Sequence, residues 1–134
     1  MSLTCSQTTR LKVPSQTAHF KAAEWRCKCS RCNKQVAHKM LPKVMEAVEA
    51  IRVKAGRPLA LNSAYRCARH PEEAKKAKPG QHNAGTAVDI RVSGGAERLE
   101  IIKLGLEFGA TGIGVANGFV HLDWRSDTPV AFVY

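Results

Sequence analysis

The chain has 134 residues, of which 44% are hydrophobic and 24% are charged. This length and composition are typical of one soluble domain with its own core, and no apolar run is long enough for a membrane span. The formal net charge is +10, which favours a polyanionic partner such as nucleic acid or an acidic cell-wall polymer. Only 6% of the residues are aromatic, and no aromatic-glycine RNA-binding signature appears. The sequence therefore does not predict binding to a specific nucleic acid.

The first half of the chain is expected to contain an irregular arm, a helix and a short strand. Residues 1–18 are polar and mixed, and they lack the apolar stretch of a secretory signal peptide. Residues 37–55 have apolar residues at helical spacing, with Pro42 acceptable only in the first turn and Gly56 as the stop. The segment "RPLALNSAYR" then predicts a strand that leads into a loop.

The second half predicts a helical turn or two in "HPEEAKKAKPG", a strand over 86–92, a helix and a hairpin. Ser93 can cap the helix, whose expected apolar face is Leu99, Ile102 and Leu106. Asn117-Gly118 joins two alternating segments and is typical of a type I′ hairpin turn. This order predicts a small single α+β domain, with a central antiparallel β-sheet flanked by helices.

Five cysteines are present, three of them in "CKCSRC". A disulfide from this cluster to Cys67, or free thiols, is the favoured interpretation. The alternative is a structural zinc site that would recruit Cys67, Cys5 or His38 as its fourth ligand. Because the count is odd, at least one thiol lies outside any set of intramolecular disulfides.

Strand alternation predicts where the polar side chains point. Asp89 lies opposite the apolar face of its strand, and His121 shares one strand face with Asp123. If both strands turn their apolar faces to one core, these three side chains share the other surface of the sheet. His82 can fold over that surface because Gly85 permits a bend.

Two imidazoles and one carboxylate have the composition of a catalytic zinc site, with a coordination position left for water. Each residue alone is more often a surface or hydrogen-bonded group, and Asp89 could simply pair with Arg66 or Arg91. The coincidence of His82, Asp89 and His121 on adjoining strands favours the metal site. The other histidines, His19, His38 and His70, have no partner signal and are expected at the surface.

The same residues carry a family resemblance. "HNAGTAVDI" resembles the H-x-x-G-x-A-x-D motif of the zinc D-alanyl-D-alanine carboxypeptidase family, which includes phage endolysins, and "SAYR" resembles its S-x-x-R motif. "HFKAAEWRCKC" and "GIGVANGFVHLDWR" are similar to the opening and closing segments of one branch. The resemblance covers about residues 19–125 and implies a hedgehog/D-Ala-D-Ala carboxypeptidase-like fold in a domain spanning 19–134. It also implies one zinc ion per chain, held by His82, Asp89 and His121.

The sequence departs from the family at the position of the general base. Members of the family often have a catalytic acid or histidine two or three residues before the last histidine, where this chain has Phe119 and Gly118. Asp123 is therefore the expected proton shuttle, and its rival role is to orient a ligand histidine or pair with Arg125. Arg66 is expected to hold the substrate and stabilise the developing oxyanion. Ser63 is expected to bind substrate or support Arg66, and the alternative is that it is a turn residue that caps the loop.

The predicted function is a zinc metallopeptidase of peptidoglycan stem peptides, acting as a carboxypeptidase or an endopeptidase in cell-wall lysis or remodelling. The alternatives are a zinc-bearing, non-catalytic wall-binding module of the same fold and a basic nucleic-acid-binding protein. The protein is expected to be a monomer. Without a signal peptide, it would stay cytoplasmic until released, as a phage lysis protein does, or be carried on a virion.

Overall fold

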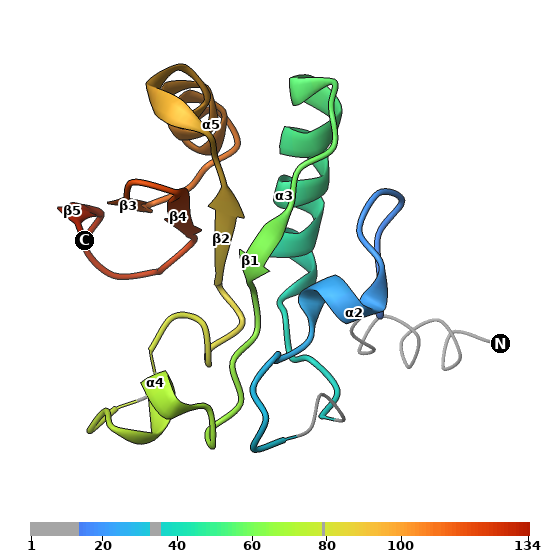
Figure 1. Cartoon of the computed structure of the whole chain (residues 1–134), viewed down its shortest axis with the longest axis vertical. Coiled ribbons are helices and arrows are strands. Elements are labelled where there is room, and N and C mark those ends of the chain that lie inside the picture. Colours follow the sequence, from blue (N-terminus) through green and yellow to red (C-terminus); the bar gives the residue numbers. More distant parts are fainter. Residues whose placement is uncertain (1–13, 33–35, 79) are drawn as a thin grey trace, which may run out of the picture.

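The computed structural model describes residues 14–32, 36–78 and 80–134, which form a single mixed α/β domain (Figure 1). The described helices are α2 (Ala22–Trp25), α3 (Pro42–Ala55), α4 (Pro71–Ala74) and α5 (Gly94–Glu107). The strands are β1 (Leu61–Ser63), β2 (Ala87–Arg91), β3 (Gly112–Val115), β4 (Phe119–Asp123) and β5 (Val130–Val133). No described helix is long and apolar enough to cross a bilayer.

The five strands form one sheet in the order β1-β2-β4-β3-β5. Neighbouring strands are antiparallel except β3 and β5, which are parallel, so the expectation of an antiparallel sheet is wrong at one edge. The reason is the connection after β4, which passes beyond β3 and adds β5 to its free edge. The β5 strand was not expected from the sequence.

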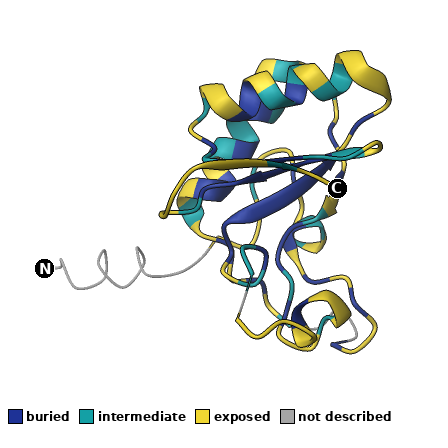
Figure 2. Cartoon of the chain, turned by 90° about the vertical axis from the view of Figure 1, so that its left-hand side faces the viewer, coloured by how far each residue is buried: buried dark blue, intermediate teal, exposed yellow. Residues whose placement is uncertain are grey.

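Helices α3 and α5 cover one face of the sheet, and Figure 2 shows their buried sides turned toward it. The core between these layers includes Val88 and Ile90 of β2 and Val120 and Leu122 of β4, all 0% exposed. The apolar residues of both strands thus alternate toward the helices, as strand parity predicts. The intervening residues of β2 and β4 point to the opposite face of the sheet.

Helix α3 begins at Pro42, five residues later than expected. Proline at the first helical position loses no intrahelical hydrogen bond, whereas it would disrupt a helix that began at Ala37. Gly56 ends the helix with a φ of 70°, and its N–H donates to the carbonyls of Arg52 and Val53. The predicted apolar side of this helix is Leu41, Val44, Met45, Val48 and Ile51. All of these residues are buried except Leu41, which precedes the first turn and is 37% exposed.

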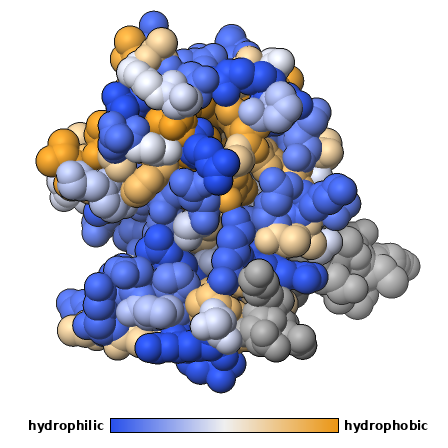
Figure 3. Space-filling view, viewed as in Figure 1, coloured by the Kyte–Doolittle hydropathy of each residue, from blue (hydrophilic) through white to orange (hydrophobic). Residues whose placement is uncertain are grey.

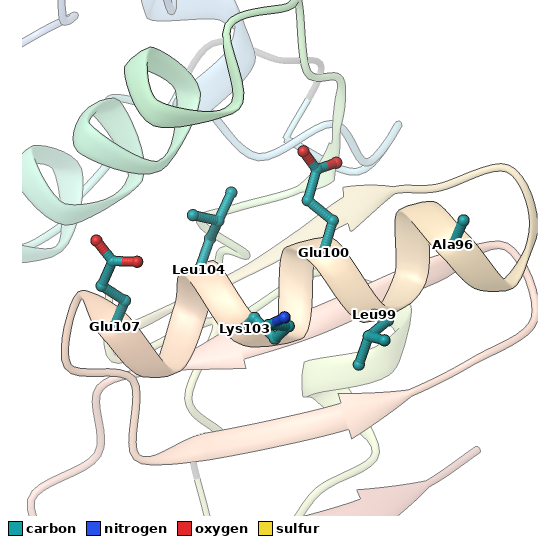
Figure 4. A pocket seen from close by; sticks show the side chains of 6 residues that line it. All are labelled: Ala96, Leu99, Glu100, Lys103, Leu104 and Glu107. Atoms are coloured by element: carbon teal, nitrogen blue, oxygen red, sulfur yellow. The ribbon is translucent and has the colours of Figure 1, made fainter.

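Helix α5 buries a different face from the expected one. Leu99 and Leu106 are 57% and 58% exposed, whereas Ile101, Leu104 and Gly105 are buried. A Cβ at Gly105 would lie 2.5 Å from Leu122 Cδ2, so the glycine lets the helix approach the sheet closely. Figure 4 shows Leu99 pointing away from the side on which Leu104 lies, beside a pocket on α5.

Two acidic residues link α5 to the end of α3. Figure 4 shows Glu100 and Glu107 on the same side of the helix as Leu104. Glu100 pairs with Arg57, and Glu107 lies 3.4 Å from Lys54 Nζ. These are partly exposed ion pairs, so they orient the helices more than they stabilise them.

The hairpin of β3 and β4 confirms the expected strand pairing, but its turn is of a different type. A type I′ turn requires positive φ at both central residues. Gly118 is not among the glycines with positive φ, which are Gly56, Gly85, Gly94 and Gly109. The hairpin closes with an Ala116 N–H to Phe119 carbonyl bond of 3.2 Å.

Candidate metal centre

The sheet places several residues of interest in one row across four strand pairings. Asp89 of β2 is paired with Ser63 of β1 on one side and with His121 of β4 on the other. His121 is in turn paired with Gly114 of β3, which is paired with Phe132 of β5. This row lies on the face opposite the core, because the core residues of β2 and β4 alternate with Asp89 and His121.

His82, Asp89 and His121 converge at this row. His82 Nε2 lies 3.3 Å from Asp89 Oδ1, and His121 Nδ1 lies 3.1 Å from the same oxygen. One ligand atom from each residue lies within 4.8 Å of the others. All three residues are 4% exposed, so the group is buried although its members are polar. The structure therefore brings together the three residues that the sequence predicted as metal ligands.

The outer nitrogens of both imidazoles have partners that set the ring orientation. His82 Nδ1 donates to the Ala64 carbonyl at 2.7 Å, and His121 Nε2 donates to Asp123 Oδ2 at 2.7 Å. The remaining nitrogens, His82 Nε2 and His121 Nδ1, point toward Asp89 Oδ1. His82 Nε2 is buried and has no hydrogen-bond partner among the described residues. A histidine bonded in this way through one nitrogen offers the other to a metal.

The loop before β2 brings His82 to the site. It bends at Gly85, whose φ is 79°. A Cβ at Gly85 would lie 2.1 Å from the Lys39 carbonyl oxygen, so a side chain is excluded there by space as well as by conformation. The bend thus requires glycine for two reasons, and it supports the sequence inference that Gly85 allows His82 to fold over the sheet.

The charges in the site favour an ionised carboxylate. Burial alone would raise the pKa of Asp89, but its hydrogen bond with His121 and its charge interactions with His82 and His121 hold the pKa of this carboxyl well below its usual range. Burial would lower the pKa of His121, but its contacts with Asp123 and Asp89 raise that pKa. Asp89 is therefore ionised at neutral pH, as a metal ligand must be.

Arg66 and Ser63 flank the ligand group. Arg66 Nη2 lies 3.4 Å from Asp89 Oδ2, and Arg66 Nε donates to Ser63 Oγ at 3.1 Å. The Arg66 side chain is 19% exposed, so its guanidinium borders the site while remaining accessible to solvent. Ser63 thus contacts Arg66, as it would if it supports this arginine. The carbonyl of Arg66 also accepts a bond from Asn83 Nδ2 at 2.9 Å, which joins this loop to the His82 loop.

Asp123 lies behind His121 and is 0% exposed. Its Oδ2 accepts hydrogen bonds from His121 Nε2 and Arg125 Nη2, both at 2.7 Å. Its Oδ1 accepts from Arg125 Nε at 2.8 Å. Burial would raise the pKa of Asp123, but Arg125 and His121 hold this pKa well below its usual range. The predicted proton shuttle is thus an ionised carboxylate whose two oxygens already have cationic or imidazole partners.

Glycines on β3 make room for these side chains, which sequence reasoning did not recognise. A Cβ at Gly112 would lie 2.2 Å from Asp123 Oδ1, and one at Gly114 would lie 2.5 Å from Phe132 and 2.9 Å from His121 Cβ. The signal was present in the alternation of "GIG", because a glycine inside a strand often marks a close approach.

Replacing Gly112 by alanine is expected to weaken metal binding at the candidate ligands, and any activity that depends on this metal, by about 10- to 100-fold. The new Cβ would displace the Asp123 carboxylate, and losing an outer partner of a ligand histidine weakens metal binding by about that factor. Zinc affinity and turnover should be measured together. Gly118→Ala is the matched control in the same hairpin, since a Cβ there meets nothing within 4 Å. Equal activity of the two variants would show that the position of Asp123 is unimportant.

Aromatic residues near β5 also border the site. The rings of Phe132 and His121 have centroids 5.3 Å apart, and Tyr134 packs against Phe132 at 5.7 Å. Burial and the negative charges of Asp89 and Asp123 raise the pKa of Tyr134 to about 12, so its hydroxyl stays protonated. Sequence reasoning missed both residues because it did not expect β5 beside β3.

The remaining histidines lie outside the ligand group. His19 is exposed and pairs with Glu49, and His70 accepts a bond from the Glu72 N–H at the start of α4. His38 is 8% exposed, so its expected surface position is wrong. This histidine can be buried because both of its ring nitrogens have hydrogen-bond partners. Nε2 contacts the Ser15 carbonyl at 3.1 Å, and Nδ1 accepts from the Met40 N–H at 3.2 Å.

Comparison with known protein families identifies a metallopeptidase family whose match includes the candidate metal site. A search of curated proteins finds no match. The sequence model described as peptidase M15 matches residues 18–123, which include all three candidate ligands and most of the chain. Members of this family are metallopeptidases that usually depend on zinc, and the His-Asp-His group described above could hold such an ion. The chain therefore belongs to the peptidase M15 family, the family of the zinc D-Ala-D-Ala carboxypeptidases.

Proposed function

We propose that this protein is a zinc-dependent peptidase that hydrolyses peptidoglycan stem peptides, with a hedgehog/D-Ala-D-Ala carboxypeptidase-like fold. The observation that carries the proposal is the buried, unpartnered Nε2 of His82, which faces Asp89 and His121. A buried nitrogen without a hydrogen bond is costly, and a metal ion would remove that cost. Membership of the peptidase M15 family supports hydrolysis as the function of the site.

The donor set fits zinc. His82 would bind through Nε2, His121 through Nδ1 and Asp89 through a carboxylate oxygen, which are nitrogen and oxygen ligands that suit a borderline metal ion. Bound there, zinc supplies a Lewis acid and a water whose pKa is lowered to about 7. The protein's own contribution is to hold the two rings in orientation through Ala64 and Asp123.

Arg66 would bind the substrate beside the metal. Its guanidinium is partly exposed and is oriented by Ser63, so it can donate to a peptide carbonyl or a terminal carboxylate. In the peptide-free protein, its neighbour is Asp89 Oδ2 at 3.4 Å, a long contact that substrate can replace at little cost. Its donors would also stabilise the charge that develops on the carbonyl oxygen during attack.

The contacts of Asp123 support a positioning role in preference to the expected proton shuttle. A shuttle must reach the attacking water, but this carboxylate is fully buried and bonded to both His121 and Arg125. From there it can fix the tautomer of His121 and make its Nδ1 a stronger ligand. We therefore assign Asp123 to the orientation of His121.

The surface charge supports an anionic substrate. The formal net charge is +10, and Figure 3 shows a mostly hydrophilic surface over α4 and the neighbouring loops. A basic surface would concentrate the enzyme on an anionic cell wall, and the association would weaken as salt increases.

Digestion of purified peptidoglycan, with and without a chelator, tests the proposal. We expect new peptide ends that mass spectrometry identifies, loss of their release with chelator, and recovery when zinc is restored. The ends would also distinguish a carboxypeptidase from an endopeptidase. Stoichiometric zinc with wall binding but no new ends would instead identify a non-catalytic binding module. Tight, steeply salt-dependent DNA or RNA binding without hydrolysis would identify a nucleic-acid-binding protein.

Replacing Arg66 by alanine is expected to reduce turnover by about 100- to 1,000-fold, as loss of an oxyanion donor does, while zinc content and Tm stay close to those of the unmodified protein. Arg91→Ala is the matched control, because Arg91 is an exposed arginine of β2 bonded to Asn62. Turnover, zinc content and Tm should be measured on both variants. An Arg66→Ala protein that unfolds or loses zinc would show that this arginine has a structural role.

A further inference from the structure

Four buried cysteines form a second cluster, separate from the His-Asp-His group. Cys27, Cys29 and Cys32 follow α2, and Cys67 follows β1 in the same loop as Arg66. Their exposed fractions are 1%, 7%, 4% and 5%, in chain order. The described cysteines form no disulfide, so all four sulfurs are free thiols that converge in the interior. Cys5 lies outside the described residues.

Four of the six sulfur–sulfur distances are close to the edge length of a metal–thiolate tetrahedron. They are 3.5 Å for Cys27–Cys29, 3.6 Å for Cys27–Cys67, 3.5 Å for Cys29–Cys32 and 3.7 Å for Cys29–Cys67. All four sulfurs lie within 4.8 Å of one another. Four zinc–sulfur bonds of about 2.3 Å in a tetrahedron give edges of about 3.8 Å. A disulfide instead requires about 2.05 Å between two sulfurs, and pairing would leave the convergence of four unexplained.

We propose that Cys27, Cys29, Cys32 and Cys67 bind a second zinc ion in a closed structural site. Each thiol loses its proton to solvent as its sulfur–zinc bond forms, and no oxidant or reductant is needed. Four protein ligands fill the coordination shell, so this ion takes no part in hydrolysis. The expected zinc content therefore rises from one ion per chain to two.

The site would position the catalytic loop. Cys67 follows Arg66 directly and lies three residues after Ala64, whose carbonyl orients His82. The same loop is joined to the last residue of α2, directly before the cysteine segment, by a Tyr65 N–H to Trp25 carbonyl bond of 3.1 Å. A zinc ion shared by Cys67 and the "CKCSRC" cysteines would fasten these two segments together, and with them the Ala64 carbonyl and Arg66.

The surroundings of the cluster suit a zinc bound by four thiolates, which carries a net negative charge. The cysteine segment contains Arg26, Lys28 and Arg31, and Arg69 follows Cys67 by two residues. Arg31 Nη1 donates to the Arg69 carbonyl at 3.2 Å, which joins the two segments on the outside of the cluster. Soft thiolate ligands also favour zinc over magnesium or calcium.

Zinc analysis of a variant that lacks the catalytic ligands tests this second site. The unmodified protein should contain two zinc ions, and His82→Ala/His121→Ala should retain one. Loading that variant with Co²⁺ should produce intense near-ultraviolet thiolate-to-cobalt absorption, and stripping its metal should lower its Tm by more than about 10 °C. Cys67→Ser in the same background should lose the remaining metal, whereas Cys5→Ser should keep it. A double variant without zinc, or cobalt without thiolate absorption, would overturn the proposal.

Alkylation of the unmodified protein gives a second test that does not depend on the folding of any variant. With zinc bound, the four cluster thiols should resist a thiol reagent, and a chelator should expose them. Mass spectrometry of the alkylated peptides identifies which thiols reacted. Rapid alkylation of these thiols in zinc-loaded protein would contradict the proposed cysteine site. So would a protein mass that is lower by the four hydrogens lost when two disulfides form. Neither result bears on the His-Asp-His site, whose test is hydrolysis.

Discussion

Replacing either His82 or His121 by alanine is expected to remove the proposed catalytic zinc and abolish the proposed hydrolysis. Each variant deletes one of three predicted ligands, so metal affinity should fall by more than the roughly 10- to 100-fold that losing an outer partner costs. The loss also leaves Asp89 with one imidazole neighbour fewer in a buried site. Elemental analysis and peptidoglycan hydrolysis should be measured on the same preparations.

His19→Ala is the matched control for these ligand variants. His19 is an exposed histidine that pairs with Glu49 and is not one of the three candidate ligands. It should keep both its full zinc content and its activity. If His82→Ala and His121→Ala each retained as much zinc as the unmodified protein, the His-Asp-His site would bind no metal. The cysteine cluster would then hold all of the zinc.

Replacing Asp123 by asparagine separates the two roles considered for this residue. If Asp123 orients His121, the variant should bind zinc about 10- to 100-fold more weakly, and excess zinc should restore most of the turnover. If Asp123 is the proton shuttle, zinc affinity should stay nearly intact while turnover falls by about 100- to 10,000-fold. The hydrogen bonds to His121 and Arg125 favour the first outcome.

Zinc affinity and turnover should therefore be measured with and without added metal. Asp127→Asn is a suitable control, because Asp127 lies two residues beyond Arg125 and is exposed. Unchanged zinc affinity with turnover that added zinc does not restore would return Asp123 to the role of proton shuttle. Restoration by zinc would mean that another group accepts the proton from water.

The sequence by itself determined the features that depend on local periodicity. Alternation along two strands was enough to place Asp89, His121 and Asp123 on one face, because successive side chains of a strand point to opposite sides. The helical spacing of α3 likewise identified the residues that it buries, and Gly56 marked its end, whereas its start was expected five residues too early. The motif around His82 supplied the third candidate ligand, since Gly85 can adopt the bend that brings the histidine to the sheet.

Long-range packing decided the features that the sequence did not reveal. Helix α5 buries Gly105 against Leu122, and no hydrophobicity pattern shows that a glycine docks there. The β5 strand pairs with β3, which is not its neighbour in the chain, so local sequence patterns do not reveal this pairing. The pairing places Phe132 beside His121.

Chemical roles depended on tertiary structure most strongly. Strand parity puts Asp123 beside His121, but only the side-chain positions show that Arg125 and His121 occupy its oxygens. The cysteines are a similar case, because a spacing of Cys27, Cys29 and Cys32 is compatible with disulfides, free thiols or zinc. The loop after β1 brings Cys67 Sγ to 3.7 Å from Cys29 Sγ, which completes a group of four converging sulfurs. A local pattern specifies which side chains share a face, whereas their chemistry depends on partners that only folding supplies.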